Sequence, residues 1–520
     1  MGRTRWALLS VSNTTGIVDF ALCLREMGYA LVATPGTHTI ISAAGIAVSA
    51  IEDVTGYPLV FNGLVKSLHP HIFGGILMDH GNPAALAEAE AHGIPVFDIV
   101  AINVPTLRRD SPEEIIVGRT DVGGLAVMRA AASNHQQVLV ITEPLDYPRV
   151  LAALRSPEGP SLTLRRELAH AAWNIVANYD TRVAVCYDDA AGESFPTVLR
   201  GEFHRVSTLK YGENPQQQAA LYAAQDMECP CIAGARQIHG GPMSYNNMLD
   251  ADSALELVLE FAAPGAVVVK HAVPVCAAIA ANHAHALQKT FAAETSSRVG
   301  AVIAVNGPVD EACAGALIAP DRTIDVLVAT DFTDAALRML TAPGAVGGEC
   351  RLIKTGGKTS PAGTGQRLRP LALRHVGGGI LAQTIDTGLY GPGGFRVIST
   401  REPSDQELVD LELALLVAKH TRSHACVLAK EGCTLAVSSV QTSRAESAHI
   451  AIGHAGASAR GCVMASDGVL LPAELGLLGA AGITAVIHSG VEGETESALA
   501  EIARKFDMAM LITRMRHFSH

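Results

Sequence analysis

The chain has 520 residues and a formal net charge of −12, and its composition is 48% hydrophobic and only 17% charged. A chain of this length exceeds one ordinary hydrophobic core, so we expect roughly two to four domains. The negative charge argues against a general nucleic-acid-binding protein, because such proteins need a basic face. Ten cysteines are scattered without the spacing of a metal site, which predicts free thiols and no metal ligands.

The segments that resemble export or membrane signals do not meet their requirements. The amino-terminal stretch MGRTRWALLSVSN reaches polar residues too early for the apolar core of a secretion signal. The most apolar late stretch, residues 468–487, contains Pro472 and Glu474, and its pattern predicts a helix followed by a strand. We therefore expect a cytoplasmic protein with neither a membrane nor a nucleic acid as its partner.

The first part of the chain alternates short apolar runs with helical patterns. Residues 5–13 and 29–34 predict strands, and residues 16–28 and 38–45 predict helices that end at glycines. This alternation indicates a parallel α/β sheet, in which ligands bind at the carboxyl ends of strands. The hydroxyl-rich segments LSVSNTTG and VATPGTHT occupy two such ends, which favours a phosphate site there.

A polar segment at residues 186–196 is the best candidate linker, and a second, larger α/β region follows it. That region contains two similar runs, GAVVVKHAVP and SHACVLAKEG, which predict a duplicated sub-domain. The first run is expected to be a strand that ends at Lys270 and His271 and turns at Pro274. Glycine- and proline-rich stretches at 354–365 and 388–394 predict loops.

Several segments occur in a fixed order along the chain. The first part contains LLSVSNTTGIVDFA, VKSLHPHIFGGIL and TDVGGLAVMRAAASNH. The second part contains LKYGENPQQQAALY, MSYNNMLDADSALELV, VVKHAVP, VMASDG and MRHFSH. Over essentially the whole chain, these segments resemble the cyclohydrolase domain and then the transformylase region of the bifunctional AICAR transformylase/IMP cyclohydrolase family. The resemblance implies an α/β fold, with a methylglyoxal-synthase-like parallel-sheet domain at 1–196 and a larger transformylase-like region at 197–520. Two related cytidine-deaminase-like α/β sub-domains, at about 201–370 and 371–520, are expected to form that region.

The resemblance also implies formyl transfer from the co-substrate 10-formyltetrahydrofolate to the 5-amino group of AICAR. That amine is deactivated by its conjugated ring, so the reaction needs a proton acceptor and stabilisation of the tetrahedral intermediate. By the family pattern, His271 is the base and Lys270 stabilises charge or protonates the leaving folate nitrogen. The pattern assigns folate to Asp467. It assigns the substrate to Lys210, Tyr211, Glu213, Asn214, Asp331, Arg444, Arg516 and Phe518.

Several positions depart from the transformylase pattern. The family's KHANPCG reads KHAVPVC here, with Val273 in place of an Asn and Cys276 in place of a Gly. His424 stands where the family has a catalytic Asn, and SRVGA at 297–301 replaces SAFGG. Arg514 and Ser519 also replace the usual Gly and Arg around MRHF.

The cyclohydrolase half departs further. Lys66 and Asp121 match the family's catalytic positions, and Ser10, Ser12 and Thr37 match its substrate-binding positions. Four cationic or phenolic groups of the family are replaced, by Thr14, Leu64, Pro105 and Ser133. These losses are expected to weaken phosphate binding and ring closure on the ordinary substrate.

Three functions remain open at this point. The first is a diverged enzyme that formylates an AICAR analogue, such as a pyrazole C-nucleotide in formycin-type nucleoside-antibiotic biosynthesis. The second is the ordinary transformylase/cyclohydrolase of purine biosynthesis, and the third is a catalytically dead scaffold or heteromer partner. The resemblance further implies a homodimer and a potassium ion near the segment of His424.

Overall fold

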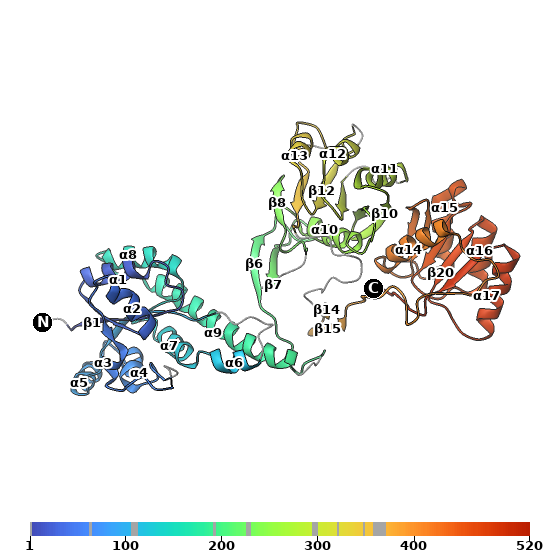
Figure 1. Cartoon of the computed structure of the whole chain (residues 1–520). Helices are drawn as coiled ribbons and strands as arrows, with labels where there is room; N and C mark the ends of the chain where they lie inside the picture. Colours follow the sequence, from blue (N-terminus) through green and yellow to red (C-terminus); the bar gives the residue numbers. More distant parts are fainter. Residues whose placement is uncertain are drawn as a thin grey trace. The chain divides into compact units, whose positions relative to one another are not determined.

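The computed structural model describes residues 3–61, 65–105, 113–190, 194–224, 230–293, 300–319, 322–346, 349–356 and 371–520. The chain divides into two compact units, Met1–Glu202 and Phe203–His520 (Figure 1). Each unit has its own sheet and its own buried hydrophobic cores.

Five parallel strands form the sheet of the first unit, in the order β3-β2-β1-β4-β5. They are β1 (Arg5–Val11), β2 (Tyr29–Ala33), β3 (Ser49–Ala50), β4 (Phe97–Asn103) and β5 (Leu139–Ile141). Successive side chains of β1 enter different cores, because Leu8 packs on one face and Ala7 and Leu9 pack on the other. Both faces of the sheet are covered, and the predicted parallel α/β sheet is confirmed.

Nine helices of the described residues accompany this sheet: α1 (Ile17–Glu26), α2 (Pro35–Ala43), α3 (Ile51–Thr55), α4 (Pro70–Leu77), α5 (Pro83–Ala91), α6 (Glu113–Arg119), α7 (Val122–Ser133), α8 (Tyr147–Arg155) and α9 (Leu162–Ala190). The helix predicted at 38–45 begins earlier, at Pro35, because proline is well tolerated in the first helical turn. The predicted linker is wrong over residues 186–190, which continue α9. Cys186 is only 3% exposed there, so this turn of the helix is still packed against the rest of the unit.

The second unit contains a twelve-stranded mixed sheet in which one arrangement occurs twice. The order is β16-β21-β20-β19-β17-β18-β10-β9-β11-β12-β13-β8, so β18 and β10 meet at the centre. Outward from that junction, both halves follow the pairing sequence antiparallel, antiparallel, parallel, parallel, antiparallel. This repeated order confirms the predicted duplication.

The two copies use corresponding elements. The first contains β8 (Arg236–His239), α10 (Tyr245–Val258), β9 (Gly265–Lys270), β10 (Val273–Ile279), α11 (His283–Ala293), β11 (Ala301–Val305), α12 (Glu311–Leu317), β12 (Ile324–Ala329), α13 (Asp334–Leu340) and β13 (Arg351–Lys354). The second contains β16 (Arg396–Val397), α14 (Asp405–Lys419), β17 (Cys426–Lys430), β18 (Cys433–Ser438), α15 (Arg444–Ala455), β19 (Val463–Ser466), α16 (Pro472–Ala481), β20 (Ala485–His488), α17 (Glu494–Lys505) and β21 (Ala509–Ile512).

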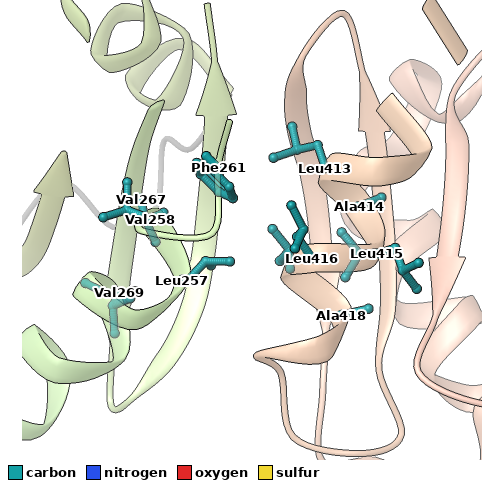
Figure 2. Close-up of a cluster of buried hydrophobic side chains, with 14 of the residues drawn as sticks. Leu257, Val258, Phe261, Val267, Val269, Leu413, Ala414, Leu415, Leu416 and Ala418 are labelled. Carbon is teal, nitrogen blue, oxygen red and sulfur yellow. The ribbon is translucent and has the colours of Figure 1, made fainter. Parts of the chain in front are cut away.

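A single apolar core joins the two copies. Figure 2 shows Leu257 of α10, Val267 of β9 and Phe261 of the segment between them facing side chains of α14, including Leu413 and Leu416. Burial of these large aliphatic side chains stabilises the junction by roughly 1.5–3 kcal/mol each. Beside this core, β10 and β18 pair at Ala278 opposite Cys433, the Ala277 N–H donates to Thr434 Oγ1 at 2.9 Å, and the Ile279 N–H donates to the Gly432 carbonyl at 2.9 Å.

Two separate hairpins complete the second unit: β6 (Phe203–Thr208) with β7 (Ala220–Ala224), and β14 (Leu371–Val376) with β15 (Gly379–Thr384). Exposed apolar side chains line β14 and β15, namely Leu373, Val376, Ile380 and Leu381. Residues 388–394 form no regular helix or strand, as predicted, whereas most of the loop predicted at 354–365 lies outside the described residues. Across the described ranges no helix is long and apolar enough to cross a membrane, and no group of three or more His, Cys, Asp or Glu side chains could hold a metal ion.

Candidate active site

Lys270 and His271 lie at the hairpin turn between β9 and β10. Lys270 pairs with Val273, so His271 and Ala272 are the central residues of the turn. Their φ angles are 54° and 57°, as in the tight turns that join antiparallel strands. The Asp250 carboxylate of α10 accepts the backbone N–H of His271 at 3.2 Å and that of Ala272 at 2.6 Å. The His271 side chain is exposed, so it is free to meet a ligand.

The prediction of a turn at Pro274 is wrong. Pro274 is buried in β10 opposite Val269, and the chain reverses before it. The cause is a carboxylate on the preceding helix, which binds the N–H groups of residues 271 and 272 and is distant in sequence.

A loop that docks on the first turn of α10 contains four predicted substrate-binding residues, Lys210, Tyr211, Glu213 and Asn214. Tyr245 donates its backbone N–H to the Tyr211 carbonyl at 3.4 Å, and the Asn246 side-chain amide donates to the Glu213 carbonyl at 3.2 Å. Asp250 lies about 7.5 Å further along the helix axis, at 1.5 Å per residue. Helix α10 therefore holds this loop and the turn at Lys270.

Arg444, the first residue of α15, is the centre of a second group of predicted site residues. Its guanidinium donates to the Val469 carbonyl at 2.7 Å, to Asp467 Oδ1 at 3.0 Å and to His424 Nδ1 at 2.9 Å. The side chains of Arg444 and Asp467 are only 10% and 0% exposed. Each charge thus compensates the other in a poorly hydrated position, where an unpaired charge would be very costly.

Residues 514–520 complete this group. Ser519 donates its N–H to Ser423 Oγ at 3.2 Å, and Ser423 donates its N–H to the Ser519 carbonyl at 2.9 Å. The Phe518 ring consequently lies edge-on to the His424 ring, with 5.7 Å between centroids. Arg516 lies 4.3 Å from the centre of the Phe518 ring, in cation–π range. We name Arg444, His424, Asp467, Arg516 and Phe518 the Arg444 cluster.

Three buried polar atoms in or beside the Arg444 cluster have no hydrogen-bond partner: Arg444 Nε, Asp467 Oδ2 and His488 Nε2. His488 Nδ1 accepts the N–H groups of Leu470 at 3.3 Å and Gly490 at 3.1 Å, which leaves the ring proton on Nε2. Burial, with the nearby Arg444 charge, lowers the pKa of His488 to about 4. Unsatisfied buried donors and acceptors are rare, and they suit a site that takes a polar ligand.

The strand registers place the Lys270 turn and the Arg444 cluster at the same edge of the sheet. β10 and β18 are antiparallel, so the start of β10 lies beside the end of β18. At that end Ser438 pairs with Cys426, and Cys426 pairs with Ser466, the residue before Asp467. In the described part of the chain, no hydrogen bond or ring contact joins the two groups directly.

Asp331 lies at the opposite edge. It follows β12, which is parallel to β11, whereas β11 is antiparallel to β9, so the end of β12 points away from Lys270. The Lys354 ammonium lies 2.6 Å from Asp331 Oδ1 and, with the Phe332 N–H, lowers the pKa of Asp331. Within one chain, Asp331 is therefore not brought to the Lys270 turn.

In the first unit, Ser10 and Ser12 lie where β1 ends beside β4. The Asn103 side-chain carbonyl accepts the N–H groups of Ser12 at 2.7 Å and Asn13 at 2.8 Å, and thereby holds the loop after β1. Thr37 is buried, and its hydroxyl bonds the backbone of Val11. After β1 the chain adds β2 and β3 on one side of the sheet and then β4 and β5 on the other. The gap between β1 and β4 is a preferred position for ligands in open α/β sheets.

Lys66 and Asp121 lie near the amino terminus of α7. Asp121 caps that helix by accepting the Gly124 N–H at 2.7 Å, and a side chain at Gly124 would come within 2.6 Å of its other oxygen. Ser67 lies against Gly123 in the first turn of α7, which brings the neighbouring Lys66 to this end of the helix. Lys66 also lines a pocket with Tyr57 and His69.

The replaced positions lie around the same places. Thr14 and Pro105 are exposed after β1 and β4, and the Ser133 hydroxyl bonds the Arg129 carbonyl at 2.8 Å. Leu64 lies outside the described residues, as do residues 297–299. Val273 and Cys276 lie on β10, directly after the Lys270 turn.

Sequence reasoning missed Asp250 and Asn103. A signal for Asp250 was present, because Asp250 precedes Lys270 by the same interval as Asp410 precedes Lys430. No comparable pattern marks Asn103, whose partners lie about ninety positions away.

Comparison with known proteins gives consistent matches. The family model for the AICARFT/IMPCHase bienzyme matches residues 131–454, and the model for the MGS-like domain matches residues 16–132. The "Bifunctional purine biosynthesis protein PurH" of Oceanobacillus iheyensis is 36% identical over 520 residues, covering 99% of each chain. The PurH of Bacillus subtilis is also 36% identical, with the same coverage. A solved structure, "Crystal structure of ForH", shares 33% identity and covers 36% of this chain and 100% of its own, with a TM-score of 0.34.

Proposed function

Because the chain belongs to the AICARFT/IMPCHase bienzyme family, we propose that it transfers a formyl group from 10-formyltetrahydrofolate to the amine of an aminocarboxamide nucleotide. The observation that carries this proposal is the position of Lys270 and His271 at an accessible turn. They share a sheet edge with His424, Arg444 and Asp467.

In the proposed reaction the amine nitrogen attacks the formyl carbon and His271 accepts the amine proton. The bond between that carbon and folate N10 then breaks, and Lys270 supplies the proton that N10 takes up. The products are a formamido nucleotide and tetrahydrofolate. The Lys270 ammonium and the Nε2–H of His424 supply donors for the oxyanion of the tetrahedral intermediate, which is where such donors have their largest effect.

Binding roles follow from the same side chains. Arg444 and Arg516 suit a phosphate because a guanidinium bonds two oxygens at once, and Phe518 offers a flat face to a heterocycle. Lys210, Tyr211, Glu213 and Asn214 border the nucleotide on the side of α10. Asp467 Oδ2, buried and unpartnered, suits an N–H donor of the folate.

We propose that the true substrate is an analogue of AICAR, such as a pyrazole C-nucleotide of a formycin-type pathway. His424 and Val273 alter the predicted surroundings of the heterocycle, whereas Lys270, His271 and Arg444 are kept; Cys276 is buried in the core. A retained reaction centre with an altered pocket favours a changed substrate over a lost activity. Ordinary AICAR is the alternative substrate.

Ring closure is assigned to residues 1–196 and formyl transfer to residues 197–520. Lys66 and Asp121 would move protons as the formamido carbonyl joins the carboxamide nitrogen and water leaves, and Ser10, Ser12 and Thr37 would shape the phosphate loop. With Thr14, Pro105 and Ser133 in place of cationic or phenolic groups, ring closure of the ordinary substrate should be slow. Adding lysine at 14 and 133 should raise its rate.

A homodimer is part of the proposal. Isolated two-stranded hairpins are marginal in water, and β14–β15 exposes Leu373, Val376, Ile380 and Leu381, so a second copy is expected to cover them. The position of Asp331 at the opposite sheet edge also fits a site that a second subunit completes.

The use of a folate co-substrate fits a cytoplasmic location. A potassium ion near His424 stays a prediction; the His424 carbonyl accepts a hydrogen bond from the Ser447 hydroxyl at 2.8 Å.

The test mixes the purified chain with 10-formyltetrahydrofolate and either AICAR or a pyrazole C-nucleotide analogue, and identifies products by mass spectrometry. Faster formylation of the analogue is the expected result. Equal or faster formylation of AICAR would contradict the altered substrate and leave formyl transfer standing. Absence of product and of calorimetric binding with both nucleotides would overturn the proposal in favour of a scaffold.

A further inference from the structure

We propose that Asp250 is a positioning residue for the reaction, because it holds the backbone turn that carries His271. The inference rests on the proposed formyl transfer. In this proposal Asp250 contacts neither the nucleotide nor the folate. It positions His271 through hydrogen bonds to two backbone N–H groups. Its counterpart in the second copy, Asp410, makes the same contacts at a turn that carries no histidine.

The contacts at Asp250 define the turn from one side. Its two carboxylate oxygens accept the N–H groups of His271 and Ala272 at 3.2 and 2.6 Å. Both turn residues have positive φ and neither is a glycine, so the conformation is unfavourable without outside support. Charge-assisted bonds from a carboxylate to backbone N–H groups are strong and short, and they supply that support.

The second copy repeats this construction. The Asp410 carboxylate accepts the N–H groups of Glu431 at 2.9 Å and Gly432 at 2.6 Å, between β17 and β18. Both of these residues also have positive φ, 52° and 71°. The same device therefore recurs where the sheet arrangement recurs, which marks it as part of the fold's repeated unit.

The turn at Glu431 and Gly432 is held by more contacts than the turn at His271 and Ala272. The Gly432 carbonyl accepts the Ile279 N–H at 2.9 Å, and Lys289 Nζ bonds the Glu431 carbonyl at 2.6 Å. The second turn is thus packed against the first copy and has further supports. His271 is exposed, and in the described residues the turn N–H groups at 271 and 272 bond Asp250 alone.

The experiment compares Asp250→Asn with its matched control Asp410→Asn, in the full chain. Asparagine has nearly the same shape, but its amide oxygen can accept only one of the two N–H groups and its NH2 group faces the other. One of the two hydrogen bonds is therefore lost. For each variant we would measure kcat and KM for formyl transfer, with the nucleotide that the wild-type chain turns over best. Circular dichroism would give the thermal midpoint, and NMR of 15N-histidine-labelled protein would report the His271 ring.

Asp250→Asn is expected to lower kcat by about 30- to 100-fold, as for a catalytic group displaced by roughly 1 Å, with KM changed less than threefold. Asp410→Asn should lower the thermal midpoint at least as much and leave kcat within twofold. Adding Asp250→Asn to His271→Ala should lower kcat no further, since the group that Asp250 positions is already absent.

Equal losses of kcat in both variants, or additive losses with His271→Ala, would show a merely structural role and overturn the inference. Wild-type kcat in Asp250→Asn would also overturn it. If the wild-type chain formylates no nucleotide, the formyl-transfer proposal fails by itself. The NMR arm still decides whether Asp250 holds the turn: an unchanged His271 signal in Asp250→Asn means that it does not.

Discussion

Arg444 Nη2 lies 2.9 Å from His424 Nδ1, and this contact fixes which nitrogen of the imidazole carries the proton. A guanidinium can only donate, so Nδ1 accepts and the proton of the neutral ring is on Nε2. The edge-on contact with Phe518 holds the ring from another side. His424 thus offers one directed N–H donor, the same kind of group that the side-chain amide of an asparagine offers.

The first prediction follows from this donor. His424→Asn should keep formyl transfer within about tenfold of wild type, because the amide also donates, whereas His424→Phe should lose about 100-fold in kcat. Phenylalanine is the comparison variant, since it keeps a ring against Phe518 and removes the N–H together with the Nδ1 atom that accepts from Arg444. Steady-state kinetics of the two variants check this, and a fully active His424→Phe would contradict a role for the donor.

A second prediction concerns a buried ion pair that joins the two copies. Glu260, just beyond α10, accepts from Lys419 Nζ and His420 Nε2 at the end of α14, both at 2.8 Å. Burial alone would raise the pKa of Glu260, but the hydrogen bonds and charges of His420 and Lys419 lower it from 4.5 to about 2. An acid whose folded pKa is depressed stabilises the fold above its unfolded pKa and loses that effect as the pH falls.

Glu260→Gln should therefore destabilise the second unit by about 3 kcal/mol at pH 7, because the Lys419 charge is left buried without a partner. The difference from wild type should shrink as the pH falls from about 5 towards 2. Thermal unfolding across this range measures it, with Glu412→Gln on the exposed face of α14 as the control. A constant difference at every pH would show that the pair does not titrate as described.

The extent to which sequence predicts this molecule depends on how local each signal is. The parallel sheet of the first unit was predictable, because buried strands such as Leu31–Ala33 and glycine helix stops are short-range patterns. The turn at Lys270 was not, since the Asp250 carboxylate that shapes it lies on another element. The helical pattern likewise gave no sign that α9 continues to Ala190, where buried Cys186 keeps it packed.

The candidate site shows the same division. Resemblance to a family predicted Lys270, His271 and Arg444 as site residues, but residue patterns could not say which of the predicted site residues share a sheet edge. That depends on strand direction: β9 and β17 run against β11 and β19, and this places Asp467 with the Lys270 turn and Asp331 away from it. Antiparallel pairing between distant strands is a property of the assembled sheet.

A third prediction rests on His488. Its Nδ1 accepts two backbone N–H groups, so a proton on Nδ1 would break both hydrogen bonds and leave three N–H groups facing one another. Burial lowers the pKa of His488 from 6.5 to about 4. The unfolded chain then binds more protons than the folded chain between pH 4 and 6.5, so stability rises with pH across this window.

His488→Gln keeps an acceptor for those N–H groups and does not titrate. Wild type should lose up to about 3 kcal/mol more than this variant when the pH falls from 6.5 to 4. Thermal midpoints of the two proteins at several pH values test the difference. Parallel pH curves would mean that His488 is accessible to protonation in the folded chain.

A fourth prediction follows from the opposite positions of His271 and Asp331 in the sheet. If one site takes His271 from one subunit and Asp331 from the other, a dimer that combines His271→Ala with Asp331→Asn carries both lesions in one site and leaves the other site intact. Refolding an equal mixture of the two inactive variants should then recover about one quarter of wild-type kcat, because half of the dimers are mixed and each mixed dimer has one intact site of two.

The control mixes His271→Ala with Lys270→Ala. Both lesions lie in the same turn, so each site of a mixed dimer is damaged and no activity should return. Absence of recovery in the first mixture, with mixed dimers verified by mass spectrometry, would contradict a site shared between subunits, because it means that His271 and Asp331 of one site come from the same chain.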